Sequence, residues 1–545
     1  MDTPKLRIAF LIEHDTIEKW QYEMISNLEN SFHSKIISII KLNTTKVIRP
    51  SITQFFKKKF WYQHFIQIDQ KIFNPIPNAF EPISFDNSIE YEIIEISLEE
   101  LLPKRISNKQ LELIKKIKID VLIDLTLKNR DLSSLNITKY GIWNLSHSTR
   151  ANINSNFAGI FETLLKEDSI TSFLTVKNSK NQEKIIFQSK SFVDALSISN
   201  TRNSHFWKTS LFISRKLEDL YYERGDIMEQ LNDQYSKHLI QNTKSLPRLF
   251  YLFTYSVSTF IKLITKQLMK RIELSQWILL FKFSENFLED SYNDFIRINP
   301  PKDRIWADPF TLKKGGKFFV FIEEMLIAQN KGYISVLEID QDGNYTLPVK
   351  IIENDYHMSY PFLFEDNDHL YMIPETGSNK TIELYKCVDF PYKWEFQKVL
   401  LEGEKAVDTT VFKHNEKYWI FTNKKEMVGA SAHEELFLYY TDDVIDKKWI
   451  AHPKNPIVSD VSCARSAGNI FVKDNKIYRP AQNCIKRYGY GLKIQEIIVL
   501  NENEYEEKNI DSIYPNWSND LLGTHTINHK DGLTVIDALI QRSKF

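Results

Sequence analysis

The C-terminal half of the chain repeats one pattern about every fifty residues: an apolar strand start, a polar turn and an aromatic strand. A fixed period of β-type runs separated by turn residues is typical of a β-propeller, in which each repeat forms one four-stranded blade. Five copies predict a five-bladed propeller over residues 275–545, and each copy opens with the innermost strand of its blade. The copies begin at Trp306, Ser359, Asp408, Ala467 and Thr524. We also expect residues 276–283 to form a strand that closes the propeller against the C-terminal copy, since a ring needs a seal between its first and last blades.

Residues 1–204 follow a different pattern, in which short apolar runs alternate with helical segments. The runs Leu6–Ile12, Ile119–Asp124 and Ile142–Leu145 predict buried strands, and this order of strand, helix and strand predicts a parallel α/β sheet. A ligand of such a sheet would lie at the carboxyl ends of its strands. No glycine-rich phosphate loop follows the first run, so a dinucleotide site is not expected.

Residues 205–274 form a predicted helical connector, which makes the chain a multidomain protein with an α/β part and an all-β part. Residues 249–261 contain no charge, and Lys262, Lys266 and Lys270 follow at a spacing of four, which places them on one stripe of a helix. Two interpretations stay open. The helix of residues 249–272 makes a peripheral contact with an anionic membrane surface, or it docks between two domains with its lysines in solvent.

The composition narrows the function classes. A net charge of −1 gives no electrostatic reason to expect nucleic acid as a partner. The three cysteines have no metal-ligand spacing, and unpaired thiols are the rule in a reducing compartment. We find no export signal at the N-terminus and no apolar run of about eighteen residues. We therefore expect a cytoplasmic protein, at most peripheral to the inner membrane, without a metal or an organic cofactor.

Four carboxylates in the repeats are candidates for chemistry. Asp308 and Asp408 stand at matching offsets in the first and third copies, so on a propeller they would converge on the central channel. Glu323 and Glu375 end the second strand of the first two copies, again at matching offsets. The alternative for Asp308 is that the Asp-Pro pair only forms the turn that leads into its strand.

Several motifs of these repeats resemble a known family. The segments WADPF, FIEEM, HMSYPFLF, YMIPET, VDTTVF and SCARSAGNIF, in this order and spacing over about two hundred residues, resemble the N-terminal domain of plant glucosamine inositolphosphorylceramide transferases. The layout is more distantly similar to the five-bladed propellers of arabinanases and levansucrases. In those enzymes an Asp on blade one is the base or nucleophile and a Glu on blade four is the acid. An Asp on blade three orients and tunes these catalytic groups.

The resemblance implies carbohydrate chemistry, with glycosyl transfer in surface polysaccharide or glycolipid assembly as the leading function. Forming or breaking a glycosidic bond uses paired carboxylates, so the predicted catalytic residues are Asp308 as the base, Asp408 as its partner, and Glu375. The recognised transferase of the plant proteins is a separate C-terminal domain, and we expect no counterpart of it in these 545 residues. A non-catalytic glycan-binding scaffold is therefore the first alternative function.

The fourth copy departs from the hydrolase pattern, because Arg465 and its neighbours stand where those enzymes carry the acid. An Arg cannot donate a proton at neutral pH, but it binds a phosphate or a carboxylate with two parallel hydrogen bonds. This favours a sugar or sugar-phosphate substrate. The alternative is that Arg465 pairs with Asp308 or Asp408 and only stabilises the channel. We expect no metal at His525 and His529. The predicted substrate-binding residues are Glu323, His357, Tyr360, Arg465, Arg479, Gln482, Tyr488 and His525.

The N-terminal part carries a second resemblance. The stretch GIWNLSH, which ends at His147, and Phe157–Glu162 downstream are similar to the folate-dependent formyltransferase domain, where an Asn-x-His motif and a later Asp form the site. Asn144 matches this motif, but Ser146 occupies the position of the His, His147 is one residue late, and no Asp follows at the expected distance. We predict a formyltransferase-like fold with a degenerate site. An N-formyltransferase acting on an amino sugar nucleotide is the second alternative function.

Overall fold

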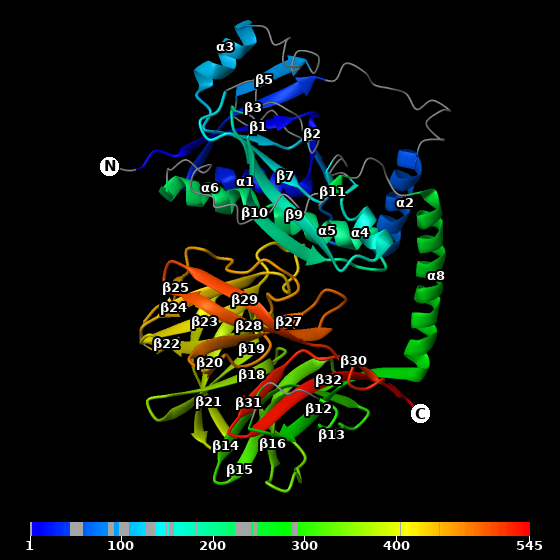
Figure 1. Ribbon diagram of the computed structural model, residues 1–545, viewed down its shortest axis with the longest axis vertical. Coiled ribbons are helices and arrows are strands. Elements are labelled where there is room, and N and C mark those ends of the chain that lie inside the picture. Colours follow the sequence, from blue (N-terminus) through cyan, green and yellow to red (C-terminus); the bar gives the residue numbers. More distant parts are fainter. Residues whose placement is uncertain are drawn as a thin grey trace. The chain divides into compact units, whose positions relative to one another are not determined.

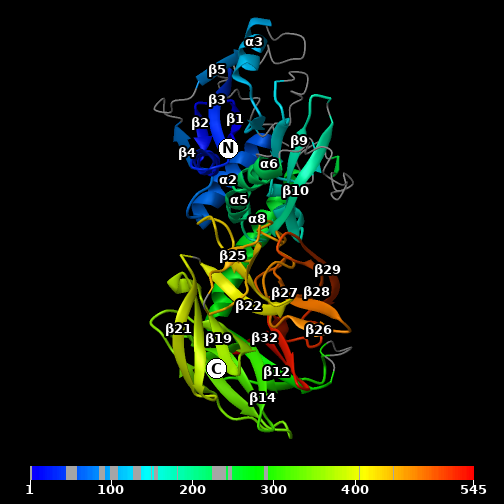
Figure 2. The ribbon, with the colours of Figure 1, turned by 90° about the vertical axis from the view of Figure 1, so that its left-hand side faces the viewer.

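The computed structural model describes residues 3–43, 58–84, 92–97, 108–126, 137–148, 150–151, 157–180, 182–223, 241–242, 248–285, 287, 292–403, 405–445 and 447–545. The chain divides into two compact units, of which the first contains residues 1–259 and 427–430 and the second contains residues 260–426 and 431–545. Within the predicted connector, residues 224–240 and 243–247 lie outside the described residues. Figures 1 and 2 show the first unit as helices packed on a sheet and the second as an assembly of β-sheets.

The first unit is built on a seven-stranded sheet with the strand order β10-β9-β7-β6-β1-β3-β5. Neighbouring strands from β7 to β5 in this order are parallel, whereas β9 runs antiparallel to both β7 and β10. The α/β prediction is therefore confirmed, with two antiparallel strands added at one edge. The strands are β1 (Leu6–Ile12), β3 (Ser34–Asn43), β5 (Glu92–Ser97), β6 (Val121–Asp124), β7 (Ile142–Ser146), β9 (Ser169–Lys177) and β10 (Glu183–Phe192).

The central strand β1 is covered on both of its faces, which explains its continuous apolar sequence. Phe10 packs with Trp20 in one core cluster, and Leu11 packs with Ile114 in another. Trp20 and Ile114 belong to different helices, α1 and α3. The helices of this unit are α1 (Lys19–Glu29), α2 (Lys58–Phe73), α3 (Asn108–Ile117), α4 (Ile160–Leu165), α5 (Ile198–Thr209) and α6 (Phe212–Glu223). Two short pairs complete it: β2 (Thr16–Glu18) with β4 (Pro82–Ser84), and β8 (Arg150–Ala151) with β11 (Gln241–Asn242).

A single long helix, α8 (Leu249–Ile272), follows along the chain and is continuous in Figure 1. Leu252 and Tyr255 of its first turns are buried against Tyr62 of α2 and against Phe157. No helix among the described residues is long and apolar enough to cross a membrane.

The second unit is the predicted five-bladed propeller. Blades one to four are four-stranded antiparallel sheets in chain order. Blade one contains β14 (Arg304–Lys314), β15 (Lys317–Leu326), β16 (Lys331–Ile339) and β17 (Val349–Ile352), and blade two contains β18 (Ser359–Asp366), β19 (His369–Thr376), β20 (Thr381–Asp389) and β21 (Lys393–Glu402). Blade three contains β22 (Ala406–His414), β23 (Lys417–Lys424), β24 (Leu436–Thr441) and β25 (Ile450–Ala451), and blade four contains β26 (Phe471–Lys473), β27 (Lys476–Asn483), β28 (Gly491–Leu500) and β29 (Tyr505–Ile513). A 3-10 turn, η5 (Gly377–Asn379), joins β19 to β20.

The fifth blade joins the two ends of the propeller. β12 (Glu273–Phe283) precedes blade one in the chain, yet it pairs antiparallel with β32 (Leu533–Ser543) along its whole length, from Glu273↔Ser543 to Phe283↔Leu533. β13 (Ile296–Ile298) flanks β12, and β30 (Leu521–Gly523) and β31 (Ile527–Lys530) pair with β32. The prediction that residues near the start of the propeller close it against its last copy is confirmed. Such closure removes the unpaired edges that an open array of blades would expose.

The inner strands of the first three blades share one local distortion. The pairing register with the second strand shifts between Ala307 and Phe310 in blade one, and at the corresponding places in blades two and three. The first residue of each bulge has a positive φ: 50° at Asp308, 45° at Tyr360 and 48° at Asp408. Non-glycine residues rarely adopt this conformation, and together with a β-bulge it redirects a side chain. The matching offsets of Asp308 and Asp408 in the sequence are therefore matching positions in the fold.

Candidate functional site

Five carboxylates lie close together at the inner strands of the propeller. The bulges of blades one and three supply Asp308 and Asp408. Glu323 and Glu375 lie on the second strands of blades one and two, where they pair with Ala307 and Ser359. Mutual electrostatic effects connect Glu323 and Glu375 with both aspartates. The fifth carboxylate, Asp537, comes from β32 and contacts the backbone N–H of Asp308. The structure thus brings together the four acids that the sequence singled out, and adds one.

Arg465 is the cation nearest to Asp408. Its Nε donates to Oδ2 of Asp408 at 2.5 Å and its Nη2 donates to Oδ1 at 3.1 Å, so the pair is bidentate. Nη2 also lies 3.8 Å from Glu375 Oε2, and Gln482 Nε2 donates to Asp408 Oδ2 at 2.8 Å. Arg465 and Asp408 are both buried. The pairing that the sequence left open for Arg465 is present in this structure, and Asp408 is its partner.

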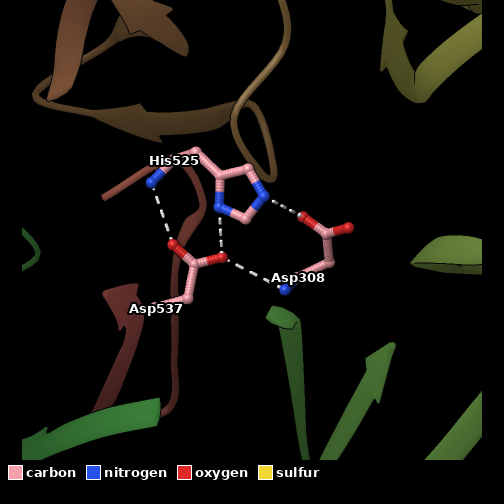
Figure 3. Close-up of side chains that lie close together, drawn as sticks. All are labelled: Asp308, His525 and Asp537. Atoms are coloured by element: carbon pink, nitrogen blue, oxygen red, sulfur yellow. Dashed lines mark hydrogen bonds and ion pairs between the residues drawn. The ribbon is translucent and has the colours of Figure 1, made fainter. Parts of the chain in front are cut away.

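A histidine flanked by two aspartates forms the second half of the site (Figure 3). His525 Nδ1 lies 2.5 Å from Asp537 Oδ2, and its Nε2 lies 3.5 Å from Asp308 Oδ1. Asp537 Oδ1 accepts hydrogen bonds from the backbone N–H groups of His525 and Thr526, at 2.9 and 3.0 Å. Asp537 is therefore held by the backbone on one side and orients the imidazole on the other, with Nε2 directed at Asp308.

Burial and crowding of like charges shift the titration of these groups. Removal from water, followed by the charges of Asp408 and Asp537, raises the pKa of Asp308 to about 6, although His525 opposes the shift. Desolvation and neighbouring carboxylates also raise the pKa values of Glu323 and Glu375 well above the usual range. Burial alone would lower the pKa of His525, but the carboxylates of Asp537 and Asp308 raise it. The site therefore holds protons at pH values where isolated carboxyl groups have lost theirs.

Aromatic rings cover one side of the charged groups. The guanidinium of Arg465 lies 4.8 Å from the ring centre of Tyr488, which also stacks on His433 at 5.1 Å and meets His525 edge-on at 5.3 Å. Tyr488 remains 39% exposed, so it is the most accessible of these side chains. Trp277 of β12 stacks on His525, with ring centres 4.1 Å apart.

His433 completes the shell of Arg465. Burial, and then the charge of Arg465, lower the pKa of His433 to about 3, so its ring is neutral near pH 7. Its Nδ1 lies 2.6 Å from Nη1 of Arg465 and accepts a hydrogen bond from it. The guanidinium is thus oriented by an aspartate on one edge and a histidine on the other.

The remaining predicted residues of the propeller are placed differently. His357 Nε2 lies 3.5 Å from Glu323 Oε1, at the edge of the acidic cluster. Tyr360 is completely buried, and its hydroxyl accepts a hydrogen bond from the N–H of Gly468 at 2.7 Å. Arg479 is not brought into the cluster: its guanidinium donates to both oxygens of Glu507, at 2.9 and 2.7 Å, and to the carbonyl of Cys463. Its role in substrate binding stays a prediction.

The two formyltransferase-like residues lie in the first unit, where His147 is completely buried. Its ring stacks on Phe206 with centres 4.1 Å apart and packs edge-on against Trp20 and His205. Neither ring nitrogen has a hydrogen-bond partner, and burial lowers the pKa of His147 to about 3. Asn144 of β7 is partly buried. A side chain sealed in this way cannot reach a substrate in this conformation. That the site is a degenerate formyltransferase site stays a prediction.

One group of residues in the part of the chain that the structure describes has the spacing of metal ligands. Donor atoms of Asp308, His525 and Asp537 all lie within 4.8 Å of one another. His525 Nδ1 and Asp537 Oδ2 already lie 2.5 Å apart as an ion pair, so a cation bound here would have to separate them. The arrangement suits proton transfer between His525 and Asp308 without further change.

Three functional candidates were not predicted from the sequence: Asp537, His433 and Trp277. Asp537 carried a usable signal, because a single acid inside the apolar run LTVIDALI is costly to bury without a partner. His433 lies in the connection between β23 and β24, where no pattern marks it. Trp277 was read only as part of the closing strand.

Comparisons with known proteins find relatives of the propeller. Residues 299–520 match the family described as "Glucosamine inositolphosphorylceramide transferase 1, N-terminal". Glucosamine inositolphosphorylceramide transferase 1 of Oryza sativa subsp. japonica is 31% identical over 204 residues, which are 37% of this chain and 27% of the rice protein. The protein of the same name from Arabidopsis thaliana is also 31% identical over 204 residues, 26% of its length. The matched segment thus spans about a quarter of these relatives.

Solved structures align with this chain only weakly. Zg3597, a family 117 glycoside hydrolase from Zobellia galactanivorans, aligns with a TM-score of 0.33 and 10% identity over 49% of this chain and 90% of its own. An exo-1,5-α-L-arabinanase from a bovine ruminal metagenomic library aligns with a TM-score of 0.31 and 13% identity over 44% of this chain and 94% of its own. The family resemblance rests on the sequence match: residues 299–520 of this chain are similar to the N-terminal part of glucosamine inositolphosphorylceramide transferase 1.

Proposed function

We propose that the protein is carbohydrate-active and that it transfers a glycosyl group during surface polysaccharide or glycolipid biosynthesis, with the propeller cluster as its site. The observation that carries the proposal is the convergence of Asp308, Asp408 and Glu375 beside Arg465. Paired carboxylates suit the oxocarbenium-like transition state of glycosyl chemistry. The family match supports the same substrate class, since the plant relatives carry the name glucosamine inositolphosphorylceramide transferase 1.

Asp308 is the proposed base of this reaction. A carboxylate with a pKa of about 6 is ionised at neutral pH, yet it is a stronger proton acceptor than an ordinary carboxylate. His525 Nε2, 3.5 Å from Asp308 Oδ1, is placed to exchange the proton taken from an acceptor hydroxyl. Asp537 acts as a positioning residue for His525. Arg465 and Tyr488 would bind the phosphate and the sugar ring of the donor.

The test is turnover by the full chain with a panel of labelled nucleotide sugars and lipid or glycan acceptors. Asp308→Asn is expected to lower the rate at least about a hundredfold, the usual contribution of a general base. Asp368→Asn, in the exposed turn between β18 and β19, is the matched control and should leave the rate unchanged. Equal rates for the two variants would contradict the role of Asp308.

A non-catalytic glycan-binding scaffold is the second candidate. It is favoured because the carboxylate oxygens of the two aspartates already accept hydrogen bonds from the protein itself. Both oxygens of Asp408 already accept from Arg465, and Asp308 accepts from Thr526 and from the backbone of Tyr360. A scaffold would bind a glycan in calorimetry without converting it, and Asp308→Asn would leave that binding intact. Retained binding together with undetectable transfer by the unmodified chain would favour this second function.

We place this activity in the cytoplasm, at the inner face of the membrane, because a lipid-linked acceptor would be reached there. Fractionation of cells that produce the full chain tests the location. Recovery outside the cytoplasm and the membrane fraction would contradict it.

A further inference from the structure

The longest helix of the protein carries an unpartnered apolar stripe. Along α8, exposed apolar side chains recur at intervals of one helical turn, and the most exposed are Phe250 at 68%, Phe253 at 67% and Phe260 at 64%. At about 100° per residue they share one face about 120° wide, which extends over about 33 Å. The stripe consists of Phe250, Phe253, Val257, Phe260, Ile261, Ile264, Leu268 and Ile272.

The charge of the helix is entirely positive. α8 contains Lys262, Lys266, Lys270 and Arg271 and no acidic residue. All four cations are exposed. The lysines lie on the side of the helix opposite the stripe, whereas Arg271 lies on the same side as the stripe, at the C-terminal end of the helix. A helix with an apolar face, a basic polar face and too little hydropathy to cross a bilayer has the composition of an interfacial membrane helix.

A second copy of the chain fits the stripe less well than a bilayer does. Pairing of two helices needs a narrow seam of alternating spacings of three and four. The positions at this spacing are apolar at Phe250, Phe253 and Val257, but nearer the C-terminal end of the helix the same spacing gives the polar residues Gln267 and Arg271. The apolar face instead widens through Leu268 and Ile272. A broad, aromatic-rich face flanked by cations is complementary to a flat, negatively charged surface.

We propose that α8 lies in the interface of an anionic lipid bilayer, with the stripe defined above inserted among the lipids and its cations near the headgroup phosphates. The buried side chains Leu252 and Tyr255 point to the other side of the helix, so insertion does not require the packing on α2 to open. This inference is independent of the proposed glycosyl transfer, because it rests on α8 alone.

The experiment is co-sedimentation of the full chain with vesicles of phosphatidylcholine alone and with vesicles that also contain phosphatidylglycerol in equal amount. We expect binding to the second kind and weak binding to the first. The double variant Phe253→Ser, Phe260→Ser should weaken binding at least about tenfold, since each exposed Phe that inserts contributes on the order of a tenfold factor. Replacing the three lysines by Gln should remove most of the preference for phosphatidylglycerol.

The matched control is Tyr251→Ser, Met269→Ser, which changes two exposed apolar side chains of α8 about a third of a turn from the centre of the stripe. It should bind vesicles nearly as the unmodified chain does. Equal loss in both double variants, or no sedimentation of the unmodified chain with either vesicle, would overturn the proposal. Sedimentation velocity that finds a dimer, dissociated by Phe253→Ser, Phe260→Ser, would assign the stripe to a second copy instead. Transfer to a soluble acceptor should be unchanged in all these variants, so failure here is distinguishable from failure of the proposed function.

Discussion

Replacing Asp308 by Asn should stabilise the propeller at neutral pH while removing the proposed base. Folding raises the pKa of this carboxyl group from its ordinary value of 3.8 to about 6, mainly because the group is withdrawn from water. Between these two pH values the native protein keeps a proton that the unfolded chain has released. The free energy of unfolding therefore falls as the pH rises from about 4 to about 6. At about 1.4 kcal/mol for each pKa unit, the ionised Asp308 costs about 3 kcal/mol above pH 6.

Asn carries no charge to desolvate, but it loses hydrogen bonds. Asp308 accepts from Thr526 Oγ1 at 2.7 Å and from the backbone N–H of Tyr360 at 3.3 Å. The amide of Asn can accept only one of them in the same pose, and each such bond is worth about 1 kcal/mol. The net gain expected at pH 7 is about 1–2 kcal/mol, or a rise of about 2–8 °C in Tm for a unit of this size.

Differential scanning calorimetry of the full chain at pH 7 and at pH 4 tests this reasoning. At pH 4 Asp308 of the unmodified protein is protonated in the native state, so Asn should bring no gain there. A lower Tm of the variant at pH 7 would mean that the carboxylate is a structural acceptor whose hydrogen bonds outweigh its desolvation. An equal gain at both pH values would mean that its charge plays no part.

Three further changes test other parts of the structure. Arg465→Met removes the bidentate partner of the buried Asp408 and should destabilise the propeller by about 3–5 kcal/mol in urea unfolding. A loss below about 1 kcal/mol would contradict this role of the pair. His147→Phe replaces a sealed ring with two unpartnered nitrogens and should stabilise the first unit by about 1–2 kcal/mol at pH 7. Burial lowers the pKa of His147 to about 3, so the unfolded chain takes up a proton at this residue before the native protein does, and the free energy of unfolding falls as the pH drops from 6.5 towards 3. The variant lacks this loss and should therefore unfold at a lower pH in an acid titration. An unchanged midpoint would contradict this. Gly468→Ala should lower Tm by several degrees, since the φ of Gly468 is 130° and a Cβ would meet the carbonyl oxygen of Ile527 at 2.1 Å.

The repeat and the two fold classes could be predicted from the sequence because they rest on local periodicity. A polar turn between two aromatic strands marks each blade whatever its neighbours are, and the apolar run of β1 is continuous because both of its faces are covered. Closure of the propeller by residues 276–283 could be predicted because the last blade would otherwise have an unpaired edge. The antiparallel pair β9 and β10 at the edge of the first sheet has no comparable signal, since its position depends on which strand it meets in space.

The site could be predicted only in part, for the same reason. Residues at repeating offsets, such as Asp308 with Asp408 and Glu323 with Glu375, were brought together by the fold's own symmetry. Arg465 and Arg479 looked alike in the sequence, yet they have different partners. The partner of Arg479 is Glu507 on β29, and that contact depends on a strand register that shifts twice between β28 and β29. Sequence patterns do not reveal such shifts.

The repeated bulge explains why the acids of this site converge at all. In a regular strand, successive side chains alternate between faces, and an inner strand of a blade would present its residues to the flanking blades. A positive φ at the first residue of each bulge turns that residue out of the alternation. The blades use the same device for different side chains: Asp308 and Asp408 carry charge, whereas Tyr360 at the equivalent position is buried and binds Gly468 of the fourth blade. The propeller thus repeats a backbone conformation that is costly for non-glycine residues, and two of its three copies hold the carboxylates on which the proposed chemistry depends.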